Sequence, residues 1–301
     1  MTSTHRILFL FSLVSLSVIN ISAQKGDDDV ISVDSSIVVL NASITGPDGK
    51  AVGGLNQKQF HVFEDGVEQA IKTFEAEETP FAAVILLDTS GSMEERVTLA
   101  RAAAIQFLGG LRAADSVSVY HFDSKIEMIQ DFSNSRDLRE QAFDLKADGM
   151  TVLNDAVYKA AEILSKRPEK RRAIIILSDG ADTMSKKSTE KALQAAMIAG
   201  TTVYSVDMSP MNENARDRMQ TLDVLKKFAD KTGGKYVSTP GGIAMRETFK
   251  RIVEELGVLY TVSYEPTNTK KDGKWRALEL RVSRPNLTIR TRKGYNAPKD
   301  K

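Results

Sequence analysis

Apolar and polar positions follow different patterns in the middle and in the flanks of this chain. Between residues 81 and 256, short continuous apolar runs, such as 82–87 and 173–177, are separated by longer segments with helical spacing. A continuous apolar run is typical of a parallel strand that is covered on both faces. Strands that alternate with helices predict a doubly wound, mostly parallel sheet, so we expect an α/β domain here.

The same spacing gives the expected order of elements in this domain. We predict further strands at residues 116–122, 125–132, 202–206 and 235–238. We predict helices at residues 94–111, 136–145, 153–165, 189–199, 219–232 and 245–256. The first helix has an inward apolar stripe made of Val97, Ala100, Ala104, Phe107 and Leu111.

The flanks, residues 24–80 and 257–296, instead alternate with a period of two, which is typical of strands with one buried face. The alternating apolar positions are Val38, Leu40, Ala42 and Ile44, then Leu278, Leu280 and Val282. Turns are predicted at Asp48-Gly49 and Asp65-Gly66, and a hairpin turn at Asp272-Gly273. Because neither flank has enough strands for a stable domain, we expect them to pair into one small β-sandwich. The α/β domain would then be an insertion into that sandwich.

The first 23 residues predict an export signal. His5 and Arg6 precede an apolar run at residues 7–18, and Ala23 supplies a small residue before a cleavage point. The run is too short for a typical membrane span, although an uncleaved anchor is the alternative. No later segment is long and apolar enough to cross a bilayer. We therefore expect a secreted or periplasmic protein without an integral membrane span after signal removal.

Charge and residue counts exclude several classes of function. The chain has 41 basic and 40 acidic residues, and loss of Arg6 with the signal leaves 40 of each. This balance argues against a nucleic-acid partner. There is no cysteine, so neither disulfides nor lipid attachment through a thiol is possible. With only three histidines, His5, His61 and His121, zinc sites of several histidines are excluded and a Ser-His-Asp hydrolase is disfavoured.

Oxygen-bearing side chains gather where the predicted strands end. Asp88, Ser90 and Ser92 follow the first apolar strand, Asp179 follows the second, and Thr151 opens a helix. Ligand sites in open α/β sheets lie at the carboxyl edge of the strands. Two carboxylates and three hydroxyls suit a hard cation, so we expect Mg²⁺, with Ca²⁺ or Mn²⁺ as alternatives.

With these five positions filled, residues 81–256 resemble the von Willebrand factor A family. Its metal-ion-dependent adhesion site has the form Asp-x-Ser-x-Ser, then a Thr, then an Asp. The resemblance implies that Ser90 and Ser92 coordinate the metal through their hydroxyls and that Thr151 does so directly or through water. It implies that Asp88 and Asp179 act mainly through water and hydrogen bonds to the serines.

The flanks resemble those of secreted bacterial proteins related to this family. The N-terminal resemblance lies in Asp48-Gly49-Lys50 and in residues 60–66, which read Phe-His-Val-Phe-Glu-Asp-Gly. The C-terminal resemblance lies in Tyr264-Glu265-Pro266, Trp275-Arg276 and residues 292–295, which read Arg-Lys-Gly-Tyr. These motifs bear on family and not on mechanism.

The function expected from this site is binding. Because neutral hydroxyls leave the cation's charge partly uncompensated, one coordination position stays open to an Asp or Glu carboxylate of a protein partner. We therefore expect an adhesion or scaffold module and no enzyme activity. The alternatives are a metal-assisted hydrolase, with Ser90 as nucleophile and His121 as base, and a structural or assembly subunit whose metal site is vestigial.

Single parts of the site have simpler interpretations. Ser92 or Thr151 alone would be read as a helix cap, and Asp179-Gly180 alone as a turn. Glu94 and Glu95 are interpreted as first-turn acids that favour the helix dipole, with a second metal site as the alternative. The basic residues at 166–172 are interpreted as a helix C-terminus. Three methionines near the site, Met93, Met150 and Met208, are expected to fill the core, with an adaptable contact surface as the alternative.

A further hypothesis concerns movement. In the family that the sequence resembles, displacement of the last helix of the α/β domain accompanies ligand capture. Here the predicted helix ending at Leu256 leads straight into the returning strand at Gly257. The sequence therefore suggests that the two domains are mechanically coupled.

Overall fold

The computed structural model describes residues 37–76, 79–209, 215–238 and 242–299. The predicted signal at residues 1–23 lies outside these ranges. Within the described ranges, no helix is both long enough and apolar enough to cross a membrane.

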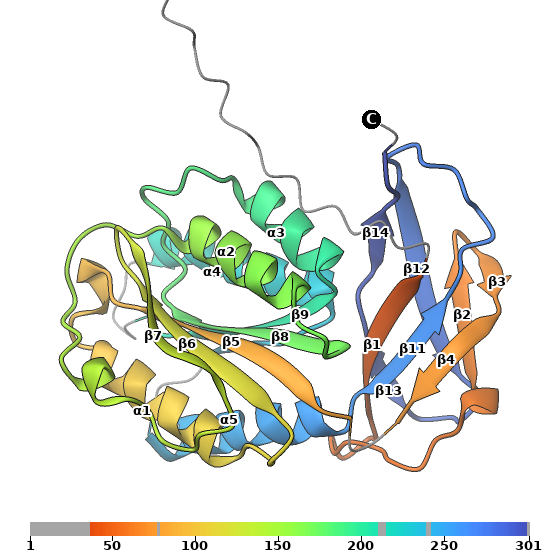
Figure 1. Cartoon of the computed structure of the whole chain (residues 1–301), viewed down its shortest axis with the longest axis horizontal. Coiled ribbons are helices and arrows are strands. Elements are labelled where there is room, and N and C mark those ends of the chain that lie inside the picture. The colour runs from red at the N-terminus through yellow and green to blue at the C-terminus, as the bar shows by residue number, and fades with distance from the viewer. Residues whose placement is uncertain (1–36, 77–78, 210–214, 239–241, 300–301) are drawn as a thin grey trace, which may run out of the picture. The chain divides into compact units, whose positions relative to one another are not determined.

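A six-stranded sheet forms the centre of the α/β unit (Figure 1). Its order is β10 (Tyr236–Ser238), β9 (Thr201–Asp207), β8 (Arg171–Ser178), β5 (Phe81–Asp88), β6 (Ser116–Phe122), β7 (Ile126–Ser133). All neighbouring pairs are parallel except β6 and β7. Every residue of β5 is buried, because helices cover both of its faces, as its apolar sequence predicts.

Helices pack on both faces of this sheet (Figure 1). One face carries α1 (Val97–Gly109) and α5 (Gly242–Gly257), and the other carries α2 (Leu153–Ser165), α3 (Thr189–Ile198) and α4 (Ala215–Thr232). Alternate residues of β5 divide between the two cores, so that Ile85 packs with α1 and α5 while Val84 packs with the other three helices. The predicted stripe of the first helix is buried at all five positions.

The flanking segments form two four-stranded sheets. One has the order β13 (Thr288–Arg290), β1 (Val38–Thr45), β11 (Tyr260–Tyr264), β4 (Ile71–Glu75). The other has the order β14 (Gly294–Asn296), β12 (Trp275–Val282), β2 (Phe60–Glu64), β3 (Val67–Gln69). Both sheets combine N-terminal and C-terminal strands and share one apolar core, which includes Leu40, Val62, Val262 and Leu280. The predicted fold class is therefore confirmed.

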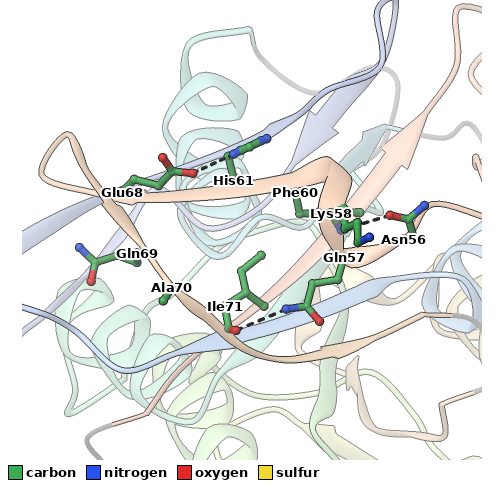
Figure 2. Close-up of a pocket in the computed structure, with 9 residues that line it drawn as sticks. All are labelled: Asn56, Gln57, Lys58, Phe60, His61, Glu68, Gln69, Ala70 and Ile71. Carbon is green, nitrogen blue, oxygen red and sulfur yellow. Dashed lines mark hydrogen bonds and ion pairs between the residues drawn. The ribbon is translucent and has the colours of Figure 1, made fainter.

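An open hollow of about 810 Å³ lies in the sandwich beside β3 and the start of β4 (Figure 2). Its lining residues all fall between positions 56 and 71. His61 lies on its wall, with Nδ1 at 2.8 Å from Glu68 Oε1. The hollow therefore belongs to the sandwich and is separate from the residues predicted to bind metal.

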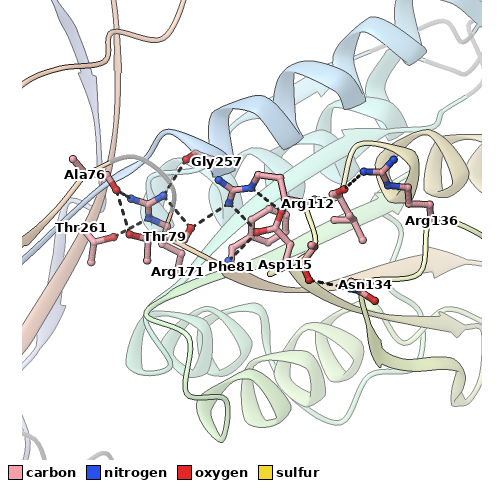
Figure 3. Close-up of polar contacts among 12 residues, drawn as sticks. Ala76, Thr79, Phe81, Arg112, Asp115, Asn134, Arg136, Arg171, Gly257 and Thr261 are labelled. Atoms are coloured by element: carbon pink, nitrogen blue, oxygen red, sulfur yellow. Dashed lines mark hydrogen bonds and ion pairs between the residues drawn. The ribbon is translucent and has the colours of Figure 1, made fainter.

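Arg171, at the start of β8, lies where the chain passes between the sandwich and the α/β unit (Figure 3). Its guanidinium donates to the carbonyls of Ala76, Thr79 and Gly257 and, at 3.2 Å, to the hydroxyl of Thr261. Ala76 and Thr79 lie in the incoming connection, between β4 and β5, and Gly257 and Thr261 lie at the outgoing connection, between α5 and β11. Burial, with a smaller contribution from the charge of Arg112, lowers the pKa of Arg171 to about 10, so it remains charged at neutral pH. One fully buried side chain thus holds both connections.

A second arginine supports the incoming connection. Arg112 forms a two-pronged ion pair with buried Asp115, at 3.0 and 2.8 Å, and donates to the Thr79 carbonyl at 3.2 Å. Asp115 also accepts from the amide of Phe81, the first residue of β5, at 3.3 Å. The start of the central strand is therefore fixed by charge-assisted hydrogen bonds, which are the stronger kind.

Two predicted elements are wrong. Residues 136–145 form only the 3-10 turn η3 (Glu140–Phe143), because just Leu138 and Ala142 of this segment are buried and two apolar contacts do not hold a helix against the core. Asp272-Gly273 does form a turn, with φ of +70° at Gly273. It is not a hairpin turn, because the strands on either side, β11 and β12, belong to different sheets.

The interpretation of residues 166–172 as a cationic helix C-terminus holds only for the start of the run, because Lys166 is the C-cap of α2. Helix α2 ends at Ser165, before the first of these cations, and its last turn holds no basic residue. Arg171 and Arg172 belong to β8 and donate to backbone carbonyls; Arg172 bonds Glu169, Arg167 and Ala199. Arg171 and Arg172 therefore hold loops in place, whereas the interpretation assigns them to the helix dipole.

Candidate metal site

Strands β5 and β8 are adjacent and parallel, and their carboxyl ends carry Asp88 and Ser178. The chain leaves β5 toward β6 on one side of the sheet and leaves β8 toward β9 on the other side. Helices α1 and α3, which follow these strands, also lie on opposite faces. The loops therefore diverge here and open the crevice where open α/β sheets bind ligands.

Three predicted site residues are joined in the loop after β5. Asp88 Oδ1 accepts hydrogen bonds from the Ser90 amide at 2.9 Å and from Ser90 Oγ at 2.6 Å. Ser90 Oγ lies 3.2 Å from Ser92 Oγ. Asp88 and Ser90 are buried, while Ser92 is exposed. The row of oxygens thus runs from the interior toward solvent.

The loop after β8 adds two more groups. Ser178 Oγ donates to Asp88 Oδ2 at 2.5 Å, so both oxygens of this carboxylate are engaged. Burial first, and then the charge of nearby Asp179, raise the pKa of Asp88 to about 7. Two carboxylates that repel each other in a buried place favour a cation between them. Ser178 directly precedes Asp179 in the sequence, but its hydrogen bond to Asp88 joins residues 90 positions apart, and the sequence pattern does not show it.

The third loop brings Thr151 against the first. The Gly91 amide donates to the Gly149 carbonyl at 3.2 Å, and the Asp148 amide donates to the Thr89 carbonyl at 2.9 Å. Gly149 has φ of +75°, and a Cβ there would lie 2.6 Å from Ser124 Oγ, so this turn requires glycine. Thr151 itself is buried.

Helix capping does not account for the hydroxyls. Ser90 is the N-cap position of the 3-10 turn η2 (Gly91–Met93), but among the described contacts its side chain makes no capping bond and donates to Asp88 instead. The N-cap of α2 is Val152, so Thr151 lies one residue too early to cap it. Asp179 does accept from the Ala181 amide at 3.0 Å, as expected for a turn.

One family model matches part of the α/β unit. Residues 83–181 match the family model for the von Willebrand factor type A domain. The α/β unit is similar to a von Willebrand factor type A domain. The matched residues include all five predicted site positions, from Asp88 to Asp179. No curated protein sequence matches the chain.

Several solved structures are similar to this chain. The minor pilin PilB from Streptococcus sanguinis has 18% identity and a TM-score of 0.46, over 61% of this chain and 62% of that one. A von Willebrand factor type A protein from Catenulispora acidiphila has 15% identity and a TM-score of 0.48, over 89% and 76%. The corresponding domain of the pili tip protein Mfa5 from Porphyromonas gingivalis has 12% identity and a TM-score of 0.49, over 58% and 95%. The chain thus spans less than two thirds of the pilin's length.

The residues of this von Willebrand factor A-like unit fit a hard cation. Neighbouring oxygens around an octahedral ion lie about 2.9 Å apart for Mg²⁺ and about 3.4 Å apart for Ca²⁺, as follows from their metal–oxygen distances. The separation of 3.2 Å between the hydroxyls of Ser90 and Ser92 falls between these values. Among the described residues, no group of three or more His, Asp or Glu side chains could hold a metal, so a site here needs the hydroxyls.

His121 does not face Ser90. Its Nδ1 lies 3.1 Å from Oγ1 of Thr89, and its Nε2 lies 3.3 Å from Oε2 of Glu127. Both ring nitrogens therefore already have partners, while Ser90 donates to Asp88. This geometry gives no support to a serine nucleophile with a histidine base.

Other groups near the site are placed differently from their predictions. Helix α1 begins at Val97, so Glu94 and Glu95 precede its first turn, and their interpretation as first-turn acids is wrong. Met93 and Met208 are buried in the core, as expected. Met150, beside Thr151, is 48% exposed and does not fill the core.

Proposed function

We propose that this protein is a binding module that captures a carboxylate of a protein partner through a divalent cation, with Mg²⁺ as the first choice and Ca²⁺ or Mn²⁺ as alternatives. Ser90, Ser92 and Thr151 would hold the cation through hydroxyls, and Asp88 and Asp179 would orient them and balance its charge. When bound, the cation would supply a Lewis-acid position for a partner's Asp or Glu.

One observation carries this proposal: the hydroxyls of Ser90 and Ser92 lie 3.2 Å apart at the switch point of the sheet, above a buried Asp88 that feels the charge of Asp179. Neither hydroxyl is used as a helix cap among the described contacts. Exposed Ser92 leaves this edge accessible to a partner. The paired ring nitrogens of His121 favour binding over hydrolysis.

The surroundings of Thr151 suit a protein partner. Met150 and Met184 are 48% and 52% exposed, and the Met184 amide donates to the Thr151 carbonyl at 3.0 Å. Exposed methionines adapt to varied partner surfaces. The signal at residues 1–23 would deliver this module to the periplasm or the cell exterior.

The proposal is tested by titrating the purified protein with Mn²⁺ in a calorimeter and by following thermal unfolding with and without chelator. We expect saturable binding at one site and a higher melting temperature in the metal, since a ligand of the native state stabilises it. Ser92→Ala and Asp179→Ala should weaken Mn²⁺ binding roughly tenfold or more.

Ser283→Ala, which removes a hydroxyl from the sandwich, serves as the control and should bind Mn²⁺ like the unchanged protein. Absence of binding and of any thermal shift with millimolar Mg²⁺, Mn²⁺ or Ca²⁺ would refute the metal site and favour a structural subunit.

A further inference from the structure

The loop that follows Asp179 is bound to the segment that contains Thr151. We call residues 182–187 together with residues 151–155 the clasp. Nine hydrogen bonds hold its two segments in place, eight of them between the segments and one within the loop. One of these segments follows a predicted metal residue and the other contains one, so the clasp connects two sides of the candidate site.

The first part of the clasp caps helix α2 from another loop. The opening amides of a helix have no partner within it, and Val152 at the N-cap has no side-chain acceptor. Asp182 Oδ2 accepts from the Asn154 amide at 2.7 Å, and Ser185 Oγ accepts from the Asp155 amide at 3.0 Å. The same Asp182 carboxylate accepts from the Ser185 amide at 3.1 Å, which keeps the loop folded toward the helix.

In the second part of the clasp, amides of the loop donate to a carboxylate of the helix. The Asp155 carboxylate accepts from the amides of Lys186 and Lys187 at 3.0 and 2.8 Å. Because donors and acceptors come from both segments, moving either one breaks bonds on the other. The start of α2 and the loop after β8 therefore move together.

The third part of the clasp acts on Thr151 itself. The Thr151 amide donates to Oγ1 of Thr183 at 2.9 Å, and the Thr151 carbonyl accepts from the amides of Thr183 and Met184 at 2.9 and 3.0 Å. The backbone of this predicted metal ligand is thus held on both its donor and its acceptor side. The rotamers open to its side chain depend on that backbone position.

We propose that Asp182, with Asp155 and Thr183, is a positioning residue that sets Thr151 at the distance from Asp179 needed to share one cation. This inference rests on the proposed function and deepens it, because it names residues that touch no metal. Groups that orient metal ligands are worth roughly 10-fold to 100-fold in affinity. Sequence patterns cannot reveal them, since Asp182 and Asp155 look like ordinary surface acids.

The test compares Mn²⁺ dissociation constants, measured on the full protein by calorimetry or by the electron paramagnetic resonance signal of free Mn²⁺. We expect Asp182→Ala to weaken binding roughly tenfold. Asp182→Asn keeps one acceptor oxygen and loses the other, because each carboxylate oxygen accepts from a different amide, so its loss of affinity should be smaller than that of Asp182→Ala. Thr183→Val keeps the shape of an exposed side chain but removes the acceptor for the Thr151 amide, and we expect it to weaken binding also.

Ser188→Ala is the matched control, because Ser188 caps α3 by accepting from the Lys191 amide and lies just outside the clasp. It should lower the melting temperature of the metal-free protein about as much as Asp182→Ala does, yet leave Mn²⁺ affinity unchanged. If Asp182 had a purely structural role, Asp182→Ala and Ser188→Ala would lose Mn²⁺ affinity in proportion to their loss of stability.

The outcomes distinguish a failure of the clasp inference from a failure of the proposed function. If Ser92→Ala abolishes Mn²⁺ binding while Asp182→Ala and Thr183→Val bind normally, the clasp does not position the site and the proposed function stands. If the unchanged protein binds no Mn²⁺, both proposals fail. If Asp182→Ala does not fold, Thr183→Val decides alone: normal affinity overturns the inference and weakened affinity supports it.

Discussion

Some polar residues in this protein are buried and hold backbone segments together, although their neighbours in the sequence are typical of a surface. Arg171 is fully buried and donates to three backbone carbonyls and one hydroxyl, and its partners come from both connections between the sandwich and the α/β unit. In the sequence it is one of five basic residues in a charged run, with no feature that distinguishes it. Burial of one member of that run is a property of the fold and not of the pattern.

Arg171→Ala should destabilise the protein by about 3 kcal/mol or more, because the Ala76, Thr79 and Gly257 carbonyls would lose their donor in a buried place. Arg171→Lys should recover only part of this, since an ammonium lacks the planar fork. Urea unfolding followed by circular dichroism measures the difference.

Arg281→Ala is the comparison for this prediction, because Arg281 pairs with Glu279 on the exposed face of β12. Its urea midpoint should change far less than that of Arg171→Ala, because its ion pair and its contact with the Phe63 ring lie at an exposed position. Equal midpoints for Arg171→Ala and Arg281→Ala would contradict the assigned role of Arg171.

At the scale of elements, the predictions that succeeded rest on strong hydrophobic patterns. The apolar runs of β5 and β8 and the alternation of β1 and β12 place the ends of these strands within three residues. The helix expected at 136–145 failed because its composition is compatible with a helix while the core offers it little contact. The five predicted site positions follow strands or open a helix, where the sequence pattern marks them, but the clasp and the Ser178 bond are long-range contacts that leave no local signal.

The turn between β2 and β3 tests how a backbone angle at one residue affects stability. Asp65-Gly66 joins β2 to β3 with φ of +49° and +82°, the left-handed pair that a tight hairpin requires. Gly66→Ala should therefore cost about 1 kcal/mol of stability, although a Cβ there meets no atom within 4 Å.

Gly109, the last residue of α1, also has open space around it and is not among the described residues with positive φ. Gly109→Ala should stabilise the protein by a few tenths of a kcal/mol, because alanine favours the helix. Thermal unfolding of the two variants should shift in opposite directions. If both melting temperatures shifted in the same direction, the φ angle would not determine how alanine affects stability at Gly66 and Gly109.

At the scale of the whole molecule, buried tyrosines pair with carboxylates in both units. Tyr204 donates to Glu255 at 2.6 Å in the α/β unit, and Tyr264 and Tyr295 donate to buried Glu64 at 2.6 and 2.9 Å in the sandwich. Burial is the main cause that raises the pKa of all three tyrosines, and the neighbouring carboxylate adds to it. The folded state therefore keeps these protons more tightly than the unfolded chain does.

The raised pKa values predict a loss of stability in alkali. Below pH 10 both states hold the protons, so the contribution is complete. Above pH 10 the unfolded chain releases protons that the folded state retains, and each tyrosine lowers the free energy of unfolding by up to about 1.4 kcal/mol per pH unit. Urea unfolding at pH 9, 10 and 11 measures this slope, and Tyr295→Phe should make it shallower. An unchanged slope in that variant would contradict the prediction for Tyr295.

The pairing of β4 with β11 has a consequence for how this molecule is built. These two strands are antiparallel neighbours, with Glu75 opposite Thr261, and the entire α/β unit is the connection between them. A short reverse turn in place of residues 76–259 would leave all eight sandwich strands in their order. The α/β unit is thus inserted into the sandwich at a single connection, so a different domain could take its place there without any change to the sandwich core.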